Sequence, residues 1–294
     1  MSEDQDKELE HQKVAVVTGS SSGIGKETAL TLAKNNFLTY ATMRDPGKGW
    51  VLKSQAEKEK LPLKMVELDV TTDESVKNAI QSVSSEAGRI DVLVNNAGYG
   101  LMGAFEELLI EEIKAQFETN LFGLIRTTQA VLPIMRKQNS GFIVNISSGA
   151  GRFGFPGGSA YVSTKFAVEG LTESMSYELE PFGIKVILIE PGFVKTNFQQ
   201  ALIRSQHPNS PYSQMMQKRA AASSQFFQNA SEPELVAKTV LTAISTPNPN
   251  LRYLVGKDVE EWVRSKNSMT DAEFHDMMMK GFAAIGPNAG QTLQ

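Results

Sequence analysis

The chain has 294 residues, a formal net charge of −4 and no cysteine. This charge gives no general attraction to nucleic acids or anionic membranes, and the absence of cysteine excludes disulfides, thiol nucleophiles and thiolate metal sites. The hydrophobic share of 41% and the charged share of 21% are typical of a globular protein, and the three histidines are too scattered in the sequence to predict a metal site.

The two ends of the chain differ from its middle. Residues 1–12 are rich in acidic side chains and contain no apolar run, so we expect a flexible acidic tail rather than a targeting signal. All apolar runs fall short of the ~20 residues that a membrane span needs. We therefore predict a cytoplasmic protein with one catalytic domain over 13–260 and a helical extension over 261–294.

Short apolar runs alternate with amphipathic stretches through this domain. Parallel strands that are buried on both faces by crossover helices produce this alternation. The predicted strands are Val14–Thr18, Phe37–Met43, Leu63–Leu68, Val92–Asn95, Phe142–Ile146, Ile184–Ile189 and Leu251–Val255, and the predicted helices are Gly25–Asn35, Asp73–Ala87, Glu111–Lys137, Tyr161–Pro181 and Pro233–Ile244. The order predicts a doubly wound, Rossmann-like α/β fold with seven parallel strands and helices on both faces.

One segment, Lys195–Asn229, interrupts the rhythm. It is long, rich in Gln and Ser, and contains Pro208 and Pro211. A connection of this length without regular structure is usually a functional lid or a mobile insertion, so we expect a substrate lid at about 195–230.

A glycine-rich turn follows the first strand, with the sequence Thr18-Gly19-Ser20-Ser21-Ser22-Gly23-Ile24-Gly25. Between a strand and a helix, such a turn exposes backbone N–H groups to the pyrophosphate of a dinucleotide. A P-loop needs a glycine and a Ser or Thr where this chain has Ser20 and Glu27, so phosphoryl transfer is a poor fit.

Tyr161 and Lys165 are four residues apart and share one face of a predicted helix. A nearby ammonium favours the phenolate, and lowering the tyrosine pKa from ~10 by about three units requires roughly 4 kcal/mol. We therefore expect this pair to carry proton transfer. A hydrolase triad is not indicated, because no histidine lies near a motif and Ser159 lacks the G-x-S-x-G context.

Further motifs stand at or just after the ends of predicted strands, where ligands bind in open α/β sheets. They are Asp69-Val70, Asn95-Asn96-Ala97-Gly98, Ser147-Ser148 and Pro191-Gly192, with Asn120 in the long helix. Together with the glycine turn and the Tyr-Lys pair, they resemble the short-chain dehydrogenase/reductase family over roughly Lys13 to Val259. The segments Thr42–Pro46 and Arg252–Asp258 are similar to the branch with hydroxysteroid and retinol dehydrogenases.

The resemblance implies an oxidoreductase that transfers a hydride between a nicotinamide cofactor and an alcohol, ketone or aldehyde. It implies that Tyr161 is the acid/base, that Lys165 lowers the tyrosine pKa and binds the nicotinamide ribose, that Ser148 rather than Ser147 polarises the carbonyl, and that Asn120 orders a proton-relay water. The implied cofactor-binding residues are Gly19, Ser21, Ser22, Gly23, Ile24, Gly25, Arg44, Asp69, Val70, Asn96, Ala97, Gly98, Tyr161, Lys165, Pro191, Gly192, Val194 and Thr196. For Asn96, a structural role and a cofactor contact are both open.

The choice between NADP and NAD depends on two neighbouring residues. Asp45 lies 20 residues beyond Gly25, where an acid binds the ribose hydroxyls of NAD. However, the predicted strand ends at Met43, and an uncharged residue followed by Arg44 resembles members that prefer NADP, because a guanidinium pairs well with a 2′-phosphate. We favour NADP, with NAD as the alternative, and Asp45 then orients Arg44 or caps the turn.

Aromatic residues suggest an apolar substrate. Phe193, Phe198 and the Phe153–Gly157 loop stand near the expected pocket, so we expect an apolar alcohol or carbonyl compound. The resemblance also implies a homodimer or homotetramer built on the two long helices, which carry extra apolar residues (Phe117, Leu121, Leu124, Phe166 and Leu171). The alternative to an enzyme is a dinucleotide-binding, redox-sensing regulator, which would not need the full catalytic set.

Overall fold

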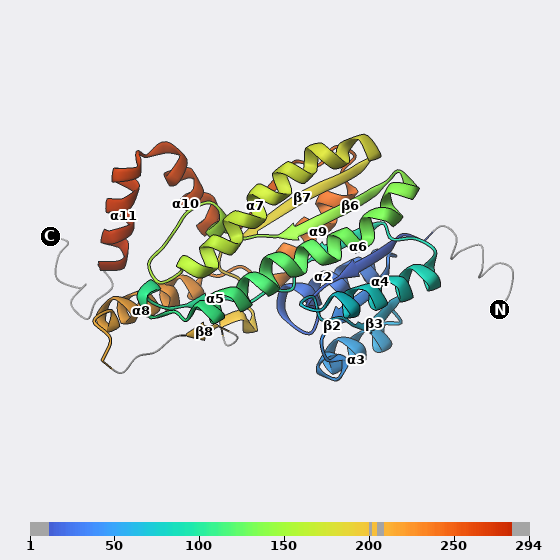
Figure 1. The fold of residues 1–294 in the computed structure, drawn as a ribbon, viewed down its shortest axis with the longest axis horizontal. Coiled ribbons are helices and arrows are strands. Elements are labelled where there is room, and N and C mark those ends of the chain that lie inside the picture. Colours follow the sequence, from blue (N-terminus) through green and yellow to red (C-terminus); the bar gives the residue numbers. More distant parts are fainter. Residues whose placement is uncertain (1–11, 200–201, 205–208, 284–294) are drawn as a thin grey trace, which may run out of the picture.

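The computed structural model describes residues 12–199, 202–204 and 209–283. The predicted acidic tail, apart from Gln12, and residues 284–294 of the predicted C-terminal extension lie outside this range. Within the described residues, seven strands form one parallel sheet in the order β3-β2-β1-β4-β6-β7-β9. Figure 1 labels β2, β3, β6 and β7 of this sheet. The strands are β1 Val14–Val17, β2 Leu38–Met43, β3 Leu63–Glu67, β4 Val92–Asn95, β6 Gly141–Ile146, β7 Ile184–Pro191 and β9 Arg252–Val255. The predicted fold class is confirmed.

The sheet reverses its winding at β1. Val17 lies beside Ala41 of β2 on one side and beside Val94 of β4 on the other. All four residues of β1 are buried, as a central strand covered by helices on both faces requires. The carboxyl ends of β1 and β4 therefore meet at a topological switch point, the place where open α/β sheets bind ligands.

Two layers of helices cover the sheet (Figure 1). On one face, α2 (Gly23–Lys34), α3 (Trp50–Glu59) and α9 (Pro233–Ser245) pack their apolar residues on the strands. On the other face lie α4 (Asp73–Ala87), α6 (Gly123–Gln138) and α7 (Ser159–Leu179). This arrangement explains the continuous apolar runs of the strands, because both sides of each central strand are buried.

The long helix predicted over Glu111–Lys137 contains an irregularity. The structure has α5 (Ile110–Phe117), a π-helical turn over Glu118–Phe122, and then α6. Asn120 lies in the π-helical turn, and its side-chain amide bonds the backbone of Tyr99 on both sides: Nδ2 donates to the carbonyl at 2.9 Å, and Oδ1 accepts from the N–H at 3.0 Å. Single π-helical turns within α-helices are frequent at functional sites.

The prediction that Lys195–Asn229 lacks regular structure was wrong. The segment contains β8 (Ile203–Arg204), which pairs with β5 (Leu101–Met102), and α8 (Ser213–Gln228). The run Arg219–Ala222 contains three alanines, which favour helix, while the surrounding Gln, Ser and Pro suggested a loop. The chain continues into α10 (Lys257–Ser268) and α11 (Asp271–Ala283). No helix among the described residues is long and apolar enough to cross a membrane.

Candidate active site

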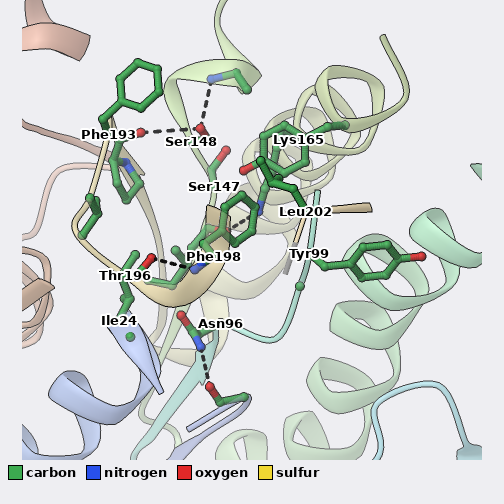
Figure 2. Close-up of a pocket in the computed structure, with 18 of the residues that line it drawn as sticks. Ile24, Asn96, Tyr99, Ser147, Ser148, Lys165, Phe193, Thr196, Phe198 and Leu202 are labelled. Carbon is green, nitrogen blue, oxygen red and sulfur yellow. Dashed lines mark hydrogen bonds between the residues drawn. The ribbon is translucent and has the colours of Figure 1, made fainter. Parts of the chain in front are cut away.

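A cavity of about 1040 Å³ opens at the carboxyl edge of the sheet. It begins at the glycine turn after β1 and ends among aromatic side chains of α8 and α10. Every predicted site residue lines it except Gly25 and Asn120, which lie behind its wall. Figure 2 shows Ser148, Lys165 and Phe198 facing the same part of this cavity. The structure therefore brings together motifs that are more than 170 residues apart in the sequence.

The glycine turn fits a bound pyrophosphate. Gly19 has φ of +67°, and a Cβ atom there would lie 2.8 Å from the Ala97 backbone. A Cβ atom on Gly25 would lie 2.4 Å from the Gly19 carbonyl oxygen, so only glycine allows this close packing. Ser22, the N-cap of α2, makes no side-chain capping bond, and the first turn of α2 carries no acidic residue. The helix N-terminus thus offers its N–H groups and positive dipole end to an anion in the cavity.

Asn96 has a structural role in this turn. Its Nδ2 donates to the carbonyl oxygens of Thr18 at 2.9 Å and Gly19 at 3.1 Å, and its backbone N–H donates to the Thr18 hydroxyl at 2.9 Å. These bonds hold the glycine turn against the loop that follows β4. Asn96 also lines the cavity, so its structural role leaves room for a contact with a bound molecule.

The side chains of Arg44 and Asp45 have different surroundings. The strand β2 ends at Met43, as predicted, and the exposed side chain of Arg44 lines the cavity. Asp45 turns away: its Oδ1 accepts from the backbone N–H of Gly47 at 2.9 Å and caps the short 3₁₀ turn Pro46–Gly49. Among the described residues, no carboxylate forms an ion pair with Arg44, so its guanidinium is available to an anionic group at this end of the cavity.

Tyr161, Ser148 and Lys165 meet in the middle of the cavity. The Ser148 hydroxyl lies near that of Tyr161 and acts on its pKa. Ser148 Oγ donates to the carbonyl oxygen of Pro191 at 3.5 Å and accepts from the backbone N–H of Ala150 at 3.1 Å. Lys165 lies one helical turn beyond Tyr161 on α7, and both are less than 10% exposed. The Nζ of Lys165 donates to the carbonyl oxygen of Ile146 at 2.8 Å, which fixes its position.

Burial dominates the acid–base properties of this group. It raises the pKa of Tyr161 to about 12, although the nearby hydroxyl of Ser148 opposes this effect. Burial also lowers the pKa of Lys165 to about 8, with the charge of Glu169 acting in the opposite direction. The expected lowering of the Tyr161 pKa by Lys165 is therefore not present in this structure. The reason is that loss of solvation acts on both groups, and each favours its neutral form.

Asn120 lies behind the cavity wall. Besides its bonds to Tyr99, its Nδ2 lies 3.2 Å from the hydroxyl of Thr164, the neighbour of Lys165 in the sequence. Asn120 is buried, and a Cβ atom on Gly98 would lie 3.0 Å from its Oδ1. The π-turn, the loop after β4 and the start of α7 are thus joined through this one amide.

The far end of the cavity is apolar and aromatic. Phe153 stacks on Trp262 with ring centres 5.6 Å apart, and Phe193 stacks on Phe226 at the same distance. The Phe153–Gly157 loop, Phe193, Phe198 and the segment 195–230 were expected here from the sequence, and α8 of that segment supplies Arg219, Phe226 and Phe227. Trp262 of α10 and Met278 of α11 were not expected, because no motif in the sequence connects the C-terminal helices to the cavity.

Comparison with known proteins assigns the chain to the family that its motifs and the geometry of the cavity indicate. Residues 13–207 match the family model described as short chain dehydrogenase. The chain belongs to the short-chain dehydrogenase family. It is therefore an oxidoreductase of the NAD(P)-dependent type, as the sequence motifs predicted.

Individual relatives cover most of the chain. A 3-ketodihydrosphingosine reductase of Bacteroides thetaiotaomicron is 35% identical over 88% of this chain and 94% of its own length. Human 17-beta-hydroxysteroid dehydrogenase type 1 is 36% identical over 82% of this chain and 76% of its own. Among solved structures, a short-chain dehydrogenase from Streptomyces avermitilis has a TM-score of 0.79 and 33% identity, covering 94% of this chain and 98% of that one. An alcohol dehydrogenase from the archaeon Thermococcus sibiricus, complexed with 5-hydroxy-NADP, has a TM-score of 0.70 and 27% identity, covering 83% and 96%.

Proposed function

We propose that this short-chain dehydrogenase uses NADP(H) to interconvert an apolar ketone or aldehyde and its alcohol, with Tyr161 as the acid/base. One observation carries the proposal. The cavity joins an anion-binding glycine turn at one end to an aromatic chamber at the other, and the neighbouring hydroxyls of Tyr161 and Ser148 lie between them.

The roles of the side chains follow from their surroundings. When bound, the nicotinamide supplies or accepts the hydride. Tyr161 keeps its proton at neutral pH, because burial raises its pKa to about 12, so its hydroxyl is in the form that can protonate a carbonyl oxygen. The Ser148 hydroxyl donates to the same oxygen and stabilises charge that develops there. Lys165, fixed by Ile146, holds a positive charge beside both groups and would bind the ribose of the cofactor. The Asn120 amide is already bonded to Tyr99, so Asn120 would support a relay water indirectly, by holding the π-helical turn in place.

NADP is the cofactor that Arg44 favours. Its guanidinium lines the cavity beyond the end of β2, while Asp45, the residue that would favour NAD, already accepts a backbone hydrogen bond. A guanidinium suits the 2′-phosphate dianion, and an acid so engaged is a poor ligand for ribose hydroxyls. The related alcohol dehydrogenase solved with 5-hydroxy-NADP supports the same choice.

The substrate we propose is a lipid-like or polycyclic alcohol or carbonyl compound. Stacked rings line the far end of the cavity, and relatives are named for a long-chain keto base, retinol and a hydroxysteroid. The segment 195–230, with α8, forms part of this wall and acts as the lid that excludes water. The single catalytic domain over 13–260 and the helical extension both contribute to the chamber.

Assembly as a homodimer or homotetramer is part of the proposal. Of the five apolar residues that suggested it, Leu124 is buried within the chain itself, whereas Phe166 of α7 is 47% exposed. Phe122, beside the π-turn, is also exposed at 46%. Measurement of the solution mass tests this, and a monomer at micromolar concentration would contradict it. Cytoplasmic location stays a prediction, which cell fractionation can test.

A substrate panel tests the main proposal. NADPH oxidation is followed with retinal, a 17-ketosteroid, 3-ketodihydrosphingosine and a short polar ketone. We expect kcat/KM for at least one apolar compound to exceed that for the polar ketone by about 100-fold, a ratio within reach of an apolar pocket. The comparisons do not favour the regulator alternative. Tight NADPH binding without turnover of any compound would nevertheless support a dinucleotide-binding regulator instead of an enzyme.

A further inference from the structure

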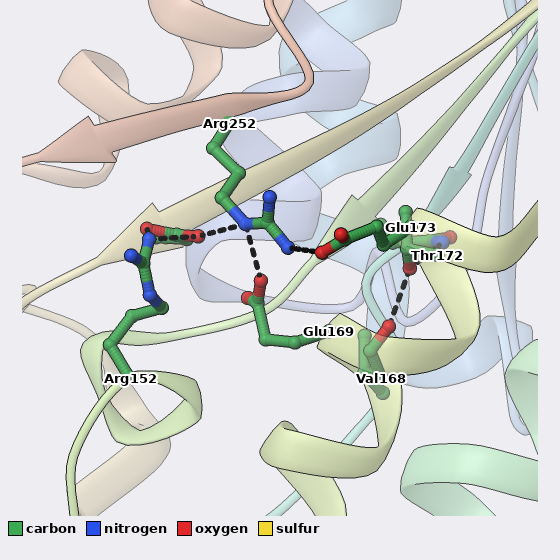
Figure 3. A network of polar contacts seen from close by, with 8 residues as sticks. Arg152, Val168, Glu169, Thr172, Glu173 and Arg252 are labelled. Atoms are coloured by element: carbon green, nitrogen blue, oxygen red, sulfur yellow. Dashed lines mark hydrogen bonds and ion pairs between the residues drawn. The ribbon is translucent and has the colours of Figure 1, made fainter. Parts of the chain in front are cut away.

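A cluster of charged side chains that includes Arg152, Glu169 and Arg252 lies next to α7 (Figure 3). Its centre is Glu190 of β7, which is 0% exposed. Arg152 donates from Nη1 to both Glu190 oxygens, at 3.1 and 3.2 Å. From β9, Nε of Arg252 lies 3.4 Å from Glu190 and 3.0 Å from Glu169, and its Nη2 donates to Glu173 at 2.6 Å. Three carboxyl groups thus share two guanidinium groups.

Glu169 connects this cluster to the active site. It lies four residues beyond Lys165 on α7, so the two side chains share one helix face, and both are less than 10% exposed. The charge of Glu169 acts on Lys165 and on Glu190. Nε of Arg252 lies 3.0 Å from a Glu169 oxygen and 3.4 Å from a Glu190 oxygen, so the two carboxyl groups flank the same guanidinium nitrogen. Two buried carboxylates this close repel each other, which favours the state in which one of them is protonated.

A small polar space adjoins Glu169. A Cβ atom on Gly151 would lie 3.1 Å from Glu169 Oε1 and 2.9 Å from Ser147 Oγ, so both oxygens border the same glycine. Both are buried, and neither has a hydrogen-bond partner among the described residues. Ser147 follows Ile146, whose carbonyl oxygen accepts from Lys165 Nζ. A second buried oxygen without a partner in the described part of the chain thus belongs to the residue next to the one that anchors Lys165.

The surroundings of Glu169 and Glu190 favour a state in which one of the two carboxyl groups is protonated and the other is ionised. Burial, followed by the charge of Glu169, raises the pKa of Glu190 well above its usual range, although Arg152 opposes the shift. Burial lowers the pKa of Lys165, and the charge of Glu169 limits this lowering. The groups that face the pair are Lys165, Glu173, Arg152 and Arg252, from α7, the turn after β6 and β9.

We propose that Glu169 and Glu190 hold one shared proton near Lys165, and that Glu169 is a positioning residue whose negative charge keeps Lys165 protonated in the working pH range. Glu169 acts through Lys165 and does not touch the substrate. Lys165 would otherwise be neutral at a lower pH, because its surroundings are nearly dry. The proposal rests on the proposed function only where it concerns turnover, since the charge state of Lys165 can be measured without a substrate.

The test follows Lys165 directly. Lysine is labelled with ¹³C at Cε, the Lys165 signal is assigned by its loss in Lys165→Met, and its pH titration is recorded for the full chain. Glu169→Gln should move the midpoint to lower pH by about one unit, a tenfold change in the proton affinity of Lys165. Glu169→Asp, which keeps the charge, should restore part of the shift. The matched control is Glu173→Gln, which alters the half-exposed partner of Arg252 and should leave the midpoint unchanged.

Glu190→Gln tests the shared proton. If the pair already holds one proton, this change leaves a single ionised carboxylate at Glu169, and the Lys165 midpoint does not fall. A fall would mean that both carboxyl groups are ionised in the native protein and would overturn the shared proton. Should this variant not fold, a ¹³Cδ glutamate titration of the native protein decides, since one carboxyl group must keep its proton above pH 6.

An unchanged Lys165 midpoint in Glu169→Gln would overturn the role of Glu169 and show that these residues form a purely structural ion-pair network. With an active substrate, the alkaline limb of kcat should shift by the same amount as the midpoint. Failure of turnover alone affects only the proposed function.

Discussion

The Nζ of Lys165 lies 5.7 Å from the centre of the Tyr161 ring and donates its hydrogen bond to the backbone carbonyl of Ile146 at 2.8 Å. The ammonium is thus bonded to the last residue of β6 and lies close to the phenol ring. The Ser148 hydroxyl also acts on the phenol and favours its ionised form, so both a cation and a hydroxyl lie near Tyr161. This arrangement can fix the position of a substrate oxygen without any protein nucleophile.

The first prediction concerns the phenolic hydroxyl. Tyr161→Phe removes it and keeps the ring that packs on Phe198, with ring centres 5.9 Å apart. We expect kcat to fall by ~10²–10⁴-fold, the usual contribution of a positioned acid/base. The affinity for NADPH, measured by fluorescence titration, should change little. The exposed Tyr177 on the same helix gives the control, because Tyr177→Phe should have the wild-type rate. A Tyr161→Phe enzyme with a large fraction of that rate would refute the assignment.

The second prediction is a pH dependence. Burial lowers the pKa of Lys165 to about 8, so its ammonium is present below this pH and is lost as the pH rises through it. Tyr161 stays protonated over the same range, because its pKa is raised to about 12. The rate of carbonyl reduction should therefore be high below pH 8 and decrease above it, as measured by kcat profiles.

Lys165→Met is the companion variant for this profile. It should reduce kcat, raise the KM for NADPH and abolish the limb near pH 8, since no group remains there to lose the charge. A limb that persists in this variant would belong to another group.

The α/β architecture and the location of the site residues at one edge of the sheet were predictable from the sequence. The protonation states of Tyr161 and Lys165 were not. Apolar runs and glycine turns are local signals, and each motif follows a strand, so a parallel sheet brings them to one edge. The pKa of Tyr161 depends instead on how completely α7, Phe198 and the loop after β6 exclude water. Four-residue spacing says that Lys165 is near, but it does not say how dry the space is.

Two other differences have similar causes. Pro208, Pro211 and many Gln and Ser residues suggested a loop, yet α8 forms and Ala222 is buried. Tertiary packing of an alanine-rich run outweighed the local turn signals. Leu124 suggested an interface between subunits, but it packs on Val168 and Leu188 of its own chain. Apolar periodicity identifies a buried face without naming what covers it.

The third prediction separates two neighbouring serines. The Ser148 hydroxyl lies beside Tyr161 and acts on its pKa, whereas the buried hydroxyl of Ser147 has no partner among the described residues and borders Gly151. Ser148→Ala should reduce kcat by about 10²-fold, the typical effect of losing a donor to a developing oxyanion. Ser147→Ala should have a clearly smaller effect. Equal losses in both variants, with unchanged thermal stability, would show that the role of Ser148 is assigned too narrowly.

The last prediction concerns cofactor preference. If Arg44 binds the 2′-phosphate, kcat/KM should favour NADPH over NADH by at least tenfold, equivalent to ~1.4 kcal/mol. Arg44→Asp should erase or reverse this preference, because it replaces a phosphate ligand by a repelling charge.

Asp45→Asn provides the control for this pair of measurements. Its amide oxygen can still accept from the Gly47 N–H, which Asp45 now does at 2.9 Å, so the cap and the preference for NADPH should both survive. The NAD alternative makes the opposite forecast. In that case the wild type prefers NADH, Arg44→Asp changes nothing, and Asp45→Asn weakens NADH binding because it removes a ribose ligand. The three proteins, each assayed with both cofactors, therefore distinguish a phosphate contact at Arg44 from a ribose contact at Asp45.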